Sequence, residues 1–119
     1  MKTKKVYLFD EHEEMRSRIC NMLQACSGIQ ICGCGSTIHE ALVHIGDLCP
    51  DVILFEIKMR NRRGIEFLQK IKSMYHQTKL IVATAYADGT ERKQALDLGA
   101  DGYWDHQQHI CILCRLIHG

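Results

Sequence analysis

The chain has few of the features that mark membrane, secreted or repetitive proteins. Its 119 residues include one proline and one tryptophan, and its 15 lysines and arginines nearly balance its 14 aspartates and glutamates. No apolar run approaches the roughly 20 residues that a membrane-spanning helix needs, and no signal-peptide segment follows Met1. The balanced charge gives no overall field that would attract nucleic acid or a membrane surface. These absences predict a cytoplasmic protein without direct nucleic-acid or membrane contact.

The motifs of common enzyme classes are also missing. The sequence has no Gly-rich phosphate loop, no hydrolase nucleophile elbow and no His-rich metalloprotease motif. We therefore predict that the chain is not an enzyme. A length of 119 residues allows one compact domain with its own core, and the absence of a low-complexity tract leaves no evident linker inside it.

Cysteine, in contrast, is plentiful. The chain has seven cysteines, and most of them lie among apolar residues. An odd count without a signal peptide favours reduced, buried thiols over a disulfide framework. A metal- or redox-responsive site stays open as an alternative, because soft ligands gather near the C-terminus. These ligands are His106, His109, Cys111, Cys114 and His118. The simpler interpretation is that Cys111 and Cys114 are small core residues of an amphipathic helix.

The segment 50–60 organises the rest of the chain. Val52 to Phe55 and then Ile57 are apolar without alternation, which predicts a strand buried on both faces in the middle of a parallel sheet. Glu56 interrupts this run near the carboxyl end of the strand, where ligands bind in open α/β sheets. A buried charge is costly without partners, so Glu56 marks the predicted site.

Strands and helices are predicted to alternate five times. The strands are expected at 5–9, 29–34, 52–55, 80–84 and 102–104, each followed by a segment with apolar residues at helical spacing. This alternation predicts a parallel sheet with right-handed crossovers. The expected fold is α/β, a flavodoxin-like (βα)5 three-layer sandwich with strand order 2-1-3-4-5. In this order Asp10, Glu11 and Glu56 form one acidic pocket at the switch point between strands one and three.

In their order along the chain, four motifs resemble the receiver domain of two-component response regulators. Phe9-Asp10-Glu11-His12 resembles the acidic pair of that family, and the segment 50–59 resembles the one that carries its phosphorylated aspartate. Val82-Ala83-Thr84-Ala85-Tyr86 resembles the hydroxyl motif of strand four, and 95–103 resembles the stretch that leads into strand five. The resemblance covers the whole chain, 1–119, as one receiver domain that either stands alone or was excised from a longer regulator.

The resemblance implies a mechanism and a set of partners. In the family, clustered carboxylates hold Mg²⁺, which here would use Glu11 and Glu56. The switch residues would be Thr84 and Tyr103. The implied partners are a histidine kinase and either an output domain or a second copy of the chain, bound through helix four, strand five and helix five. A DNA-binding output domain would make the whole protein a transcription regulator.

The sequence departs from the family pattern at the phosphoacceptor position, which is Glu56 and not aspartate. The extra methylene moves the carboxylate out by roughly 1.5 Å. Misplacing a reacting group by about 1 Å can slow the reaction about 100-fold. The lysine position is His106, and Arg60 stands where the family has proline. We therefore predict a degenerate, phosphorylation-independent receiver. Charge compensation would come from Lys58 or, more strongly, Arg60, although a solvated basic loop is the simpler interpretation.

Overall fold

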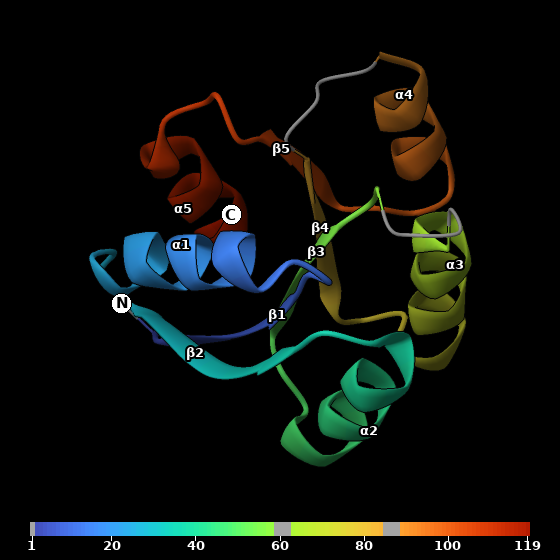
Figure 1. Cartoon of the computed structure of the whole chain (residues 1–119), viewed down its shortest axis with the longest axis horizontal. Coiled ribbons are helices and arrows are strands. Elements are labelled where there is room, and N and C mark those ends of the chain that lie inside the picture. Colours follow the sequence, from blue (N-terminus) through green and yellow to red (C-terminus); the bar gives the residue numbers. More distant parts are fainter. Residues whose placement is uncertain (1, 59–62, 85–88) are drawn as a thin grey trace.

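The computed structural model describes residues 2–58, 63–84 and 89–119. Five strands and five helices alternate along the chain (Figure 1): β1 Lys4–Phe9, α1 Glu13–Gln24, β2 Ile29–Gly35, α2 Ile38–Leu48, β3 Val52–Glu56, α3 Gly64–Met74, β4 Lys79–Thr84, α4 Gly89–Asp97, β5 Gly102–Asp105 and α5 Ile110–His118. The strands form one sheet in the order β2-β1-β3-β4-β5, and the pairings are parallel. The predicted fold class and strand order are therefore confirmed.

The register of the sheet brings the strand ends to one edge. Phe9 of β1 pairs with Phe55 of β3, and Thr84 of β4 pairs with Asp105 of β5. Because all strands run in the same direction, the residues that follow them emerge at the same edge of the sheet. The central strand β3 is buried along its whole length, as its unbroken apolar run predicts.

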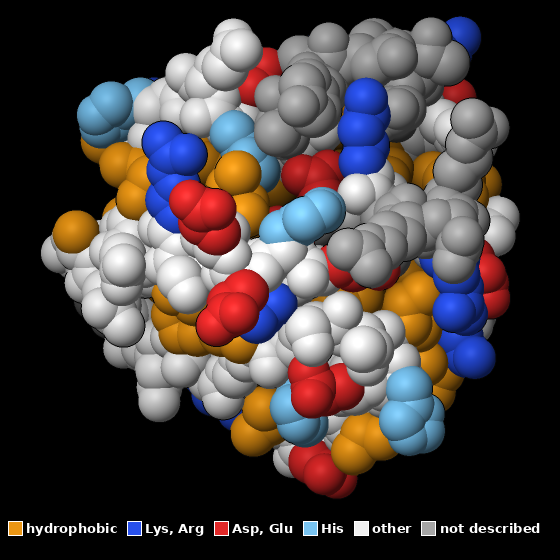
Figure 2. Space-filling model, viewed as in Figure 1, with side chains coloured by type: hydrophobic (Ala, Val, Ile, Leu, Met, Phe, Trp, Pro, Cys, Tyr) orange, Lys and Arg blue, Asp and Glu red, His pale blue; other side chains and the backbone are white. Residues whose placement is uncertain are grey.

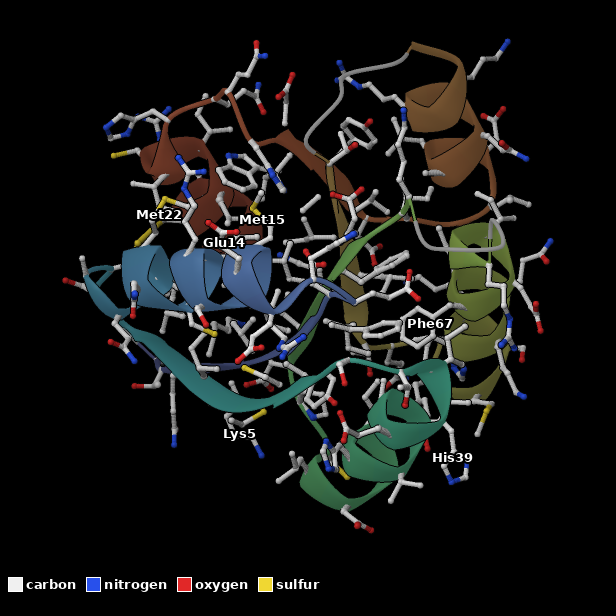
Figure 3. The ribbon with its side chains drawn as sticks, in the orientation of Figure 1. Lys5, Glu14, Met15, Met22, His39 and Phe67 are labelled. Atoms are coloured by element: carbon white, nitrogen blue, oxygen red, sulfur yellow. A yellow bond between two sulfur atoms is a disulfide. The ribbon has the colours of Figure 1, made fainter. Side chains whose placement is uncertain are left out.

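Helices cover both faces of the sheet. In Figure 1, α1 and α5 lie on one side of the strands, and α2, α3 and α4 lie on the other. Phe67 of α3 points toward the sheet in Figure 3 and lies with its ring centroid 4.8 Å from that of Phe9 and 5.1 Å from that of Phe55. On the opposite face, Met15 and Met22 of α1 lie between α1 and α5 (Figure 3) and pack against a second core cluster. Within the described residues, no helix combines the length and the apolar character needed to cross a bilayer.

Local signals explain where several helices begin and end. The Thr37 hydroxyl accepts a hydrogen bond from the Glu40 backbone N–H at 3.1 Å, which caps α2 as the capping-box spacing predicts. The Glu40 carboxylate accepts from the Ser36 N–H, one residue earlier than the motif predicts. Helix α3 begins at Gly64, where an added Cβ would collide with the carbonyl oxygen of Ile57. Glycine therefore lets α3 start directly against the end of β3.

Two cysteines are joined, contrary to the prediction of reduced thiols. Cys26 and Cys114 form a disulfide between residues 88 positions apart, with their Cα atoms 6.7 Å apart, inside the range that a disulfide spans. The sequence could not predict this pair because only the packing of α5 beside α1 brings the two together. The other five cysteines are free thiols: Cys20, Cys32, Cys34, Cys49 and Cys111.

Candidate functional site

Asp10 is held at the carboxyl end of β1. Its side chain is buried, with 2% of its surface exposed. One carboxylate oxygen, Oδ1, accepts a hydrogen bond from the His12 backbone N–H at 2.8 Å and lies 3.2 Å from His12 Nδ1. The Asp10 backbone N–H donates to the carbonyl of Gly35 at the end of β2. The carboxylate is thus fixed by the chain turn that leads into α1.

Glu56 is held at the carboxyl end of β3, beside Asp10. It is also buried, at 8% exposure. Its Oε1 accepts a hydrogen bond from the Lys58 backbone N–H at 3.0 Å. Its Oε2 lies 3.8 Å from Nε2 of His106, which follows β5. The glutamate side chain therefore folds back on its own loop and also reaches toward the end of β5.

A pocket of about 420 Å³ opens over these two acids. Its described lining is Asp10, His12, Glu14, Met15, Arg18, Glu56 and Lys58. Acidic, basic and histidine side chains also lie close together on the face shown in Figure 2. Two of the three acids predicted to form one site, Asp10 and Glu56, line this pocket. The third, Glu11, is not among its described lining residues. Arg60, the preferred candidate for charge compensation, lies outside the described residues.

Sequence reasoning missed the contribution of α1 to the pocket. The pocket is lined on this side by His12, Glu14, Met15 and Arg18, none of which the sequence pattern predicts there. Their spacing of three and four residues puts Glu14 and Arg18 on one side of a helix. Because α1 starts at Glu13, three residues after Asp10, this side of its first turns lines the pocket. His12 is the N-cap residue of α1. Placing the helix start there would have identified the α1 residues that face the pocket.

The predicted switch residues lie on neighbouring strands. Thr84 is fully buried at the end of β4, and its carbonyl accepts a hydrogen bond from the His106 backbone N–H at 2.8 Å. Tyr103 of β5 is half-buried, and the guanidinium carbon of Arg92 in α4 lies 5.9 Å from its ring centroid. A cation over an aromatic face is attracted to it. This contact links β5 to α4.

His106, which the sequence resemblance assigns to the lysine position, does not carry lysine's charge at neutral pH. Only 12% of its side chain is exposed, and neither ring nitrogen has a hydrogen-bond partner among the described residues. Burial lowers the pKa of His106, and the carboxylates of Asp10 and Asp105 only partly oppose this effect. The ring packs against Trp104 with centroids 5.2 Å apart. His106 is therefore a neutral imidazole beside Glu56 near pH 7.

The burial of His106 predicts how stability depends on pH. An imidazole in the unfolded chain titrates near pH 6.5, whereas the folded domain holds the pKa of His106 lower. Below about pH 6.5 the unfolded state binds the extra proton, so the free energy of unfolding falls as the pH decreases. We expect His106→Gln to flatten this part of the profile, measured by urea denaturation between about pH 7.5 and pH 5.5. The exposed His39 provides the matched control, His39→Gln. Equal slopes in the two variants would contradict the assignment.

The described residues do not present a ready-made cluster for the magnesium ion that the sequence predicts. Mg²⁺ needs several oxygen ligands in near-octahedral geometry. Within residues 2–58, 63–84 and 89–119, no three His, Cys, Asp or Glu side chains are arranged to hold a metal ion. Asp10 Oδ1 and Glu56 Oε1 already accept backbone N–H groups. The pairing of Glu11 and Glu56 on Mg²⁺ therefore stays a prediction.

The C-terminal histidines and cysteines do not form a metal site either. His109 Nδ1 accepts a hydrogen bond from the Cys111 backbone N–H and so caps α5. His118 Nε2 lies 3.0 Å from the carbonyl oxygen of Ser27, and Cys114 is bound in the disulfide. Cys111 is exposed. The CxxC spacing thus places its two cysteines in different environments, and the metal-binding alternative is wrong for this arrangement.

Comparison with known proteins gives a consistent result. The family model described as "Response regulator receiver domain" matches residues 6–110. The response regulator protein VraR of Staphylococcus aureus is 35% identical over 101 residues, which are 85% of this chain and 48% of VraR. The chain therefore spans about half the length of the curated relatives it matches.

Solved structures share the fold. The receiver domain of the putative response regulator NarL from Mycobacterium tuberculosis superposes with a TM-score of 0.87 at 20% identity, covering 99% of this chain and 95% of that one. RcsB from Salmonella enterica, solved bound to the promoter rprA with the phosphomimetic BeF3-, gives a TM-score of 0.87 at 18% identity and covers 99% of this chain and 68% of RcsB. At these identities the similarity extends to the fold alone.

Proposed function

The chain belongs to the response-regulator receiver family of two-component signalling, and from this premise we propose that it is an atypical receiver that signals without phosphorylation of Glu56. The observation that carries the proposal is the position of this glutamate. Glu56 ends the central strand at the phosphoacceptor position, with one oxygen accepting a hydrogen bond from its own loop. In this proposal the site would keep the strand-end acids of a receiver but would use a glutamate and a histidine in place of the aspartate and lysine of the family pattern.

Three features of the site oppose phosphoryl transfer to Glu56. The carboxylate stands one methylene further from the backbone than that of aspartate, which misplaces the nucleophile for in-line attack. Its Oε1 accepts the Lys58 N–H, which lowers the nucleophilicity of that oxygen. The neutral ring of His106 supplies no cation to offset charge on a transferring phosphoryl group.

The buried carboxylates would instead supply a constant negative charge. Asp10 and Glu56 are both buried, so cations must offset their charge. Arg18 and Lys58 line the same pocket and would supply these cations, and we retain Arg60 as an additional source. A glutamate carries one negative charge, whereas a phosphate carries about −1.5 to −2. Glu56 is therefore a weak, permanent substitute for phosphoaspartate.

The output surface in this proposal is formed by α4, β5 and α5. It is supported by two exposed apolar side chains, Leu96 at 41% and Ile112 at 38%, and by the contact between Arg92 and Tyr103 that links β5 to α4. We expect Ile112→Asp to weaken self-association or binding of an output domain at least about tenfold. Val43→Asp is the matched control, because Val43 is 50% exposed on α2, which lies on the opposite side of the sheet from α5. Equal effects of both variants in sedimentation velocity would contradict this surface.

The partners follow from the same proposal. A histidine kinase of the two-component type would dock on the domain in the cytoplasm without leaving a phosphoryl group on it. Relatives such as VraR are about twice as long as this chain, so we propose that an output domain, DNA-binding as in RcsB, responds to the receiver. The domain itself catalyses no reaction in this scheme.

Phosphodonor labelling tests the proposal directly. The intact chain is incubated with acetyl phosphate and Mg²⁺, and its mass is measured. We expect no added phosphoryl mass under conditions that label an aspartate-containing receiver to near completion. Glu56→Gln is the control, because it keeps the shape of the side chain but removes the nucleophile. Labelling that is stoichiometric in the unchanged chain and lost in Glu56→Gln would overturn the proposal.

A further inference from the structure

We propose that the disulfide between Cys26 and Cys114 is a reversible redox couple that fastens α5 to the end of α1, with a low-molecular-weight disulfide such as oxidised glutathione as its oxidant. Both cysteines are half-buried, so a small thiol reagent can reach them. Together they form a modification site separate from the acidic pocket.

The disulfide lies at the far end of the domain from the acidic pocket. Helix α1 starts at the pocket, where His12 caps it, and ends at Gln24, two residues before Cys26. The next strand, β2, begins at Ile29. The disulfide therefore joins the turn between α1 and β2 to the middle of α5. Forming or breaking the disulfide therefore affects the position of α5 directly, and it can affect the acidic pocket only through α1.

Other contacts keep α5 docked when the disulfide is open. Leu113 and Ile117 are fully buried against the sheet. The Lys79 ammonium donates a hydrogen bond to the carbonyl of Leu116 at 2.9 Å, and the His118 ring contacts the Ser27 carbonyl at 3.0 Å. Because these contacts do not need the sulfur bond, the reduced chain is expected to stay folded. The disulfide then adds a covalent link between α5 and the end of α1 that can be broken without unfolding the domain, as a reversible switch requires.

The chemistry of closure is ordinary thiol–disulfide exchange. The thiolate of Cys26 or Cys114 attacks one sulfur of oxidised glutathione, forms a mixed disulfide and expels a glutathione thiolate, which takes up a proton. The second cysteine, after losing its proton, attacks the protein sulfur of the mixed disulfide and expels the second glutathione. Two protein thiols are oxidised to one disulfide, and one oxidised glutathione is reduced to two thiols. Reduced glutathione runs the same steps backwards.

A second pair of cysteines, Cys20 and Cys34, shows which thiols are expected to oxidise and which are not. Cys20 of α1 and Cys34 of β2 have their sulfur atoms 3.3 Å apart and remain free. Burial raises the pKa of Cys34 to about 12, so its thiol stays protonated and is a poor nucleophile. Proximity alone therefore does not produce a redox couple here. We expect this pair to remain reduced under conditions that oxidise Cys26 and Cys114.

The first test follows the sulfur atoms. The full chain is equilibrated in buffers of varied reduced-to-oxidised glutathione ratio, quenched with acid, alkylated, and mapped by peptide mass spectrometry. We expect Cys26 and Cys114 to lose alkylation together in one transition, while Cys20 and Cys34 stay alkylated. Cys111→Ser, which changes an exposed cysteine of α5, should leave the transition unchanged. Full alkylation of Cys26 and Cys114 at every ratio, or glutathione adducts in place of the internal bond, would overturn the proposal.

The second test follows α5. Amide hydrogen exchange of residues 110–118 is compared in the oxidised and reduced chain, and we expect exchange about tenfold faster after reduction, because local opening no longer has to work against a covalent bond. Cys26→Ser should show the fast rate in both buffers. An oxidised rate equal to the reduced rate would overturn the fastening role. Only an effect of the disulfide on binding at the α4–β5–α5 surface would rest on the proposed function. Cysteine alkylation and amide exchange of α5 do not depend on that function, so the redox proposal and the receiver proposal can fail independently.

Discussion

A chain that carries Glu56→Asp and His106→Lys is expected to take up a phosphoryl group from acetyl phosphate and Mg²⁺ at least about 100-fold faster than the unchanged protein. The aspartate restores the length of the nucleophile, and the lysine places a cation where the neutral imidazole of His106 now lies 3.8 Å from the carboxylate. Asp10 and Thr84 already stand at the ends of β1 and β4. One acid and the hydroxyl of the family pattern therefore already stand at the strand ends where the reaction would take place.

The single variants separate the two contributions. Glu56→Asp alone should give slow labelling, because the transferring group lacks a cation from strand five. His106→Lys alone should give none, because the nucleophile is still misplaced. The assay is intact-mass spectrometry over time, with location of the phosphoryl group by peptide mapping. Rapid labelling of the unchanged chain, or no labelling of the double variant in a folded state confirmed by circular dichroism, would contradict the explanation based on these two residues.

Loss of the Cys26–Cys114 bond is expected to lower the free energy of unfolding by about 4 kcal/mol. The bond closes a loop between residues 88 positions apart, and closing loops of this length removes about 4–5 kcal/mol of entropy from the unfolded chain. The melting temperature should fall by about 10–15 °C. Urea denaturation of Cys26→Ser and of Cys114→Ser measures the effect, and the double variant should equal each single one, because either removes the same bond.

Cys111→Ser is the matched control for this stability effect. Cys111 lies on the same helix as Cys114 but is exposed and free, so its replacement should change the free energy of unfolding by less than about 0.5 kcal/mol. Adding a reductant should lower the stability of the unchanged chain to that of Cys26→Ser and leave Cys26→Ser itself unaltered. If Cys26→Ser and Cys111→Ser had the same stability, the disulfide would not be part of the folded state in solution.

The fold was predictable because several independent signals agree. The unbroken apolar run at Val52–Phe55 marks the central strand, and alternation with amphipathic segments fixes a parallel sheet. Gly99 ends the region of α4 with a φ of 108°, as a glycine after a helix predicts. The strand boundaries differ from the predictions by one residue, as at β3, which ends at Glu56 and not at Phe55. The start of α3 at Gly64 depends on the close approach of Ile57, which no local pattern in the sequence reveals.

The site was predictable only in part. Residues that immediately follow strands, such as Asp10 and Glu56, could be placed because the sheet order fixes where strand ends meet. Arg18 could not, because it reaches the pocket from the second turn of α1, and its direction depends on where that helix begins. The disulfide was hidden for a similar reason, since Cys26 and Cys114 become neighbours only when α5 packs beside α1. Sequence reasoning identified the residues on strand ends and missed those that helices bring together.

Helix α1 connects two chemically different anchors. At one end, His12 binds the Asp10 carboxylate, and just beyond the other end, Cys26 is covalently joined to α5. The helix has 12 residues and is therefore a rod about 18 Å long. Such a rod bends little, so the acidic pocket and the disulfide are joined by one rigid element. Opening the disulfide would release the C-terminal end of α1 from α5 while its start stays held at Asp10, so the oxidation state of the two cysteines would set how firmly α1 is fixed beside the pocket.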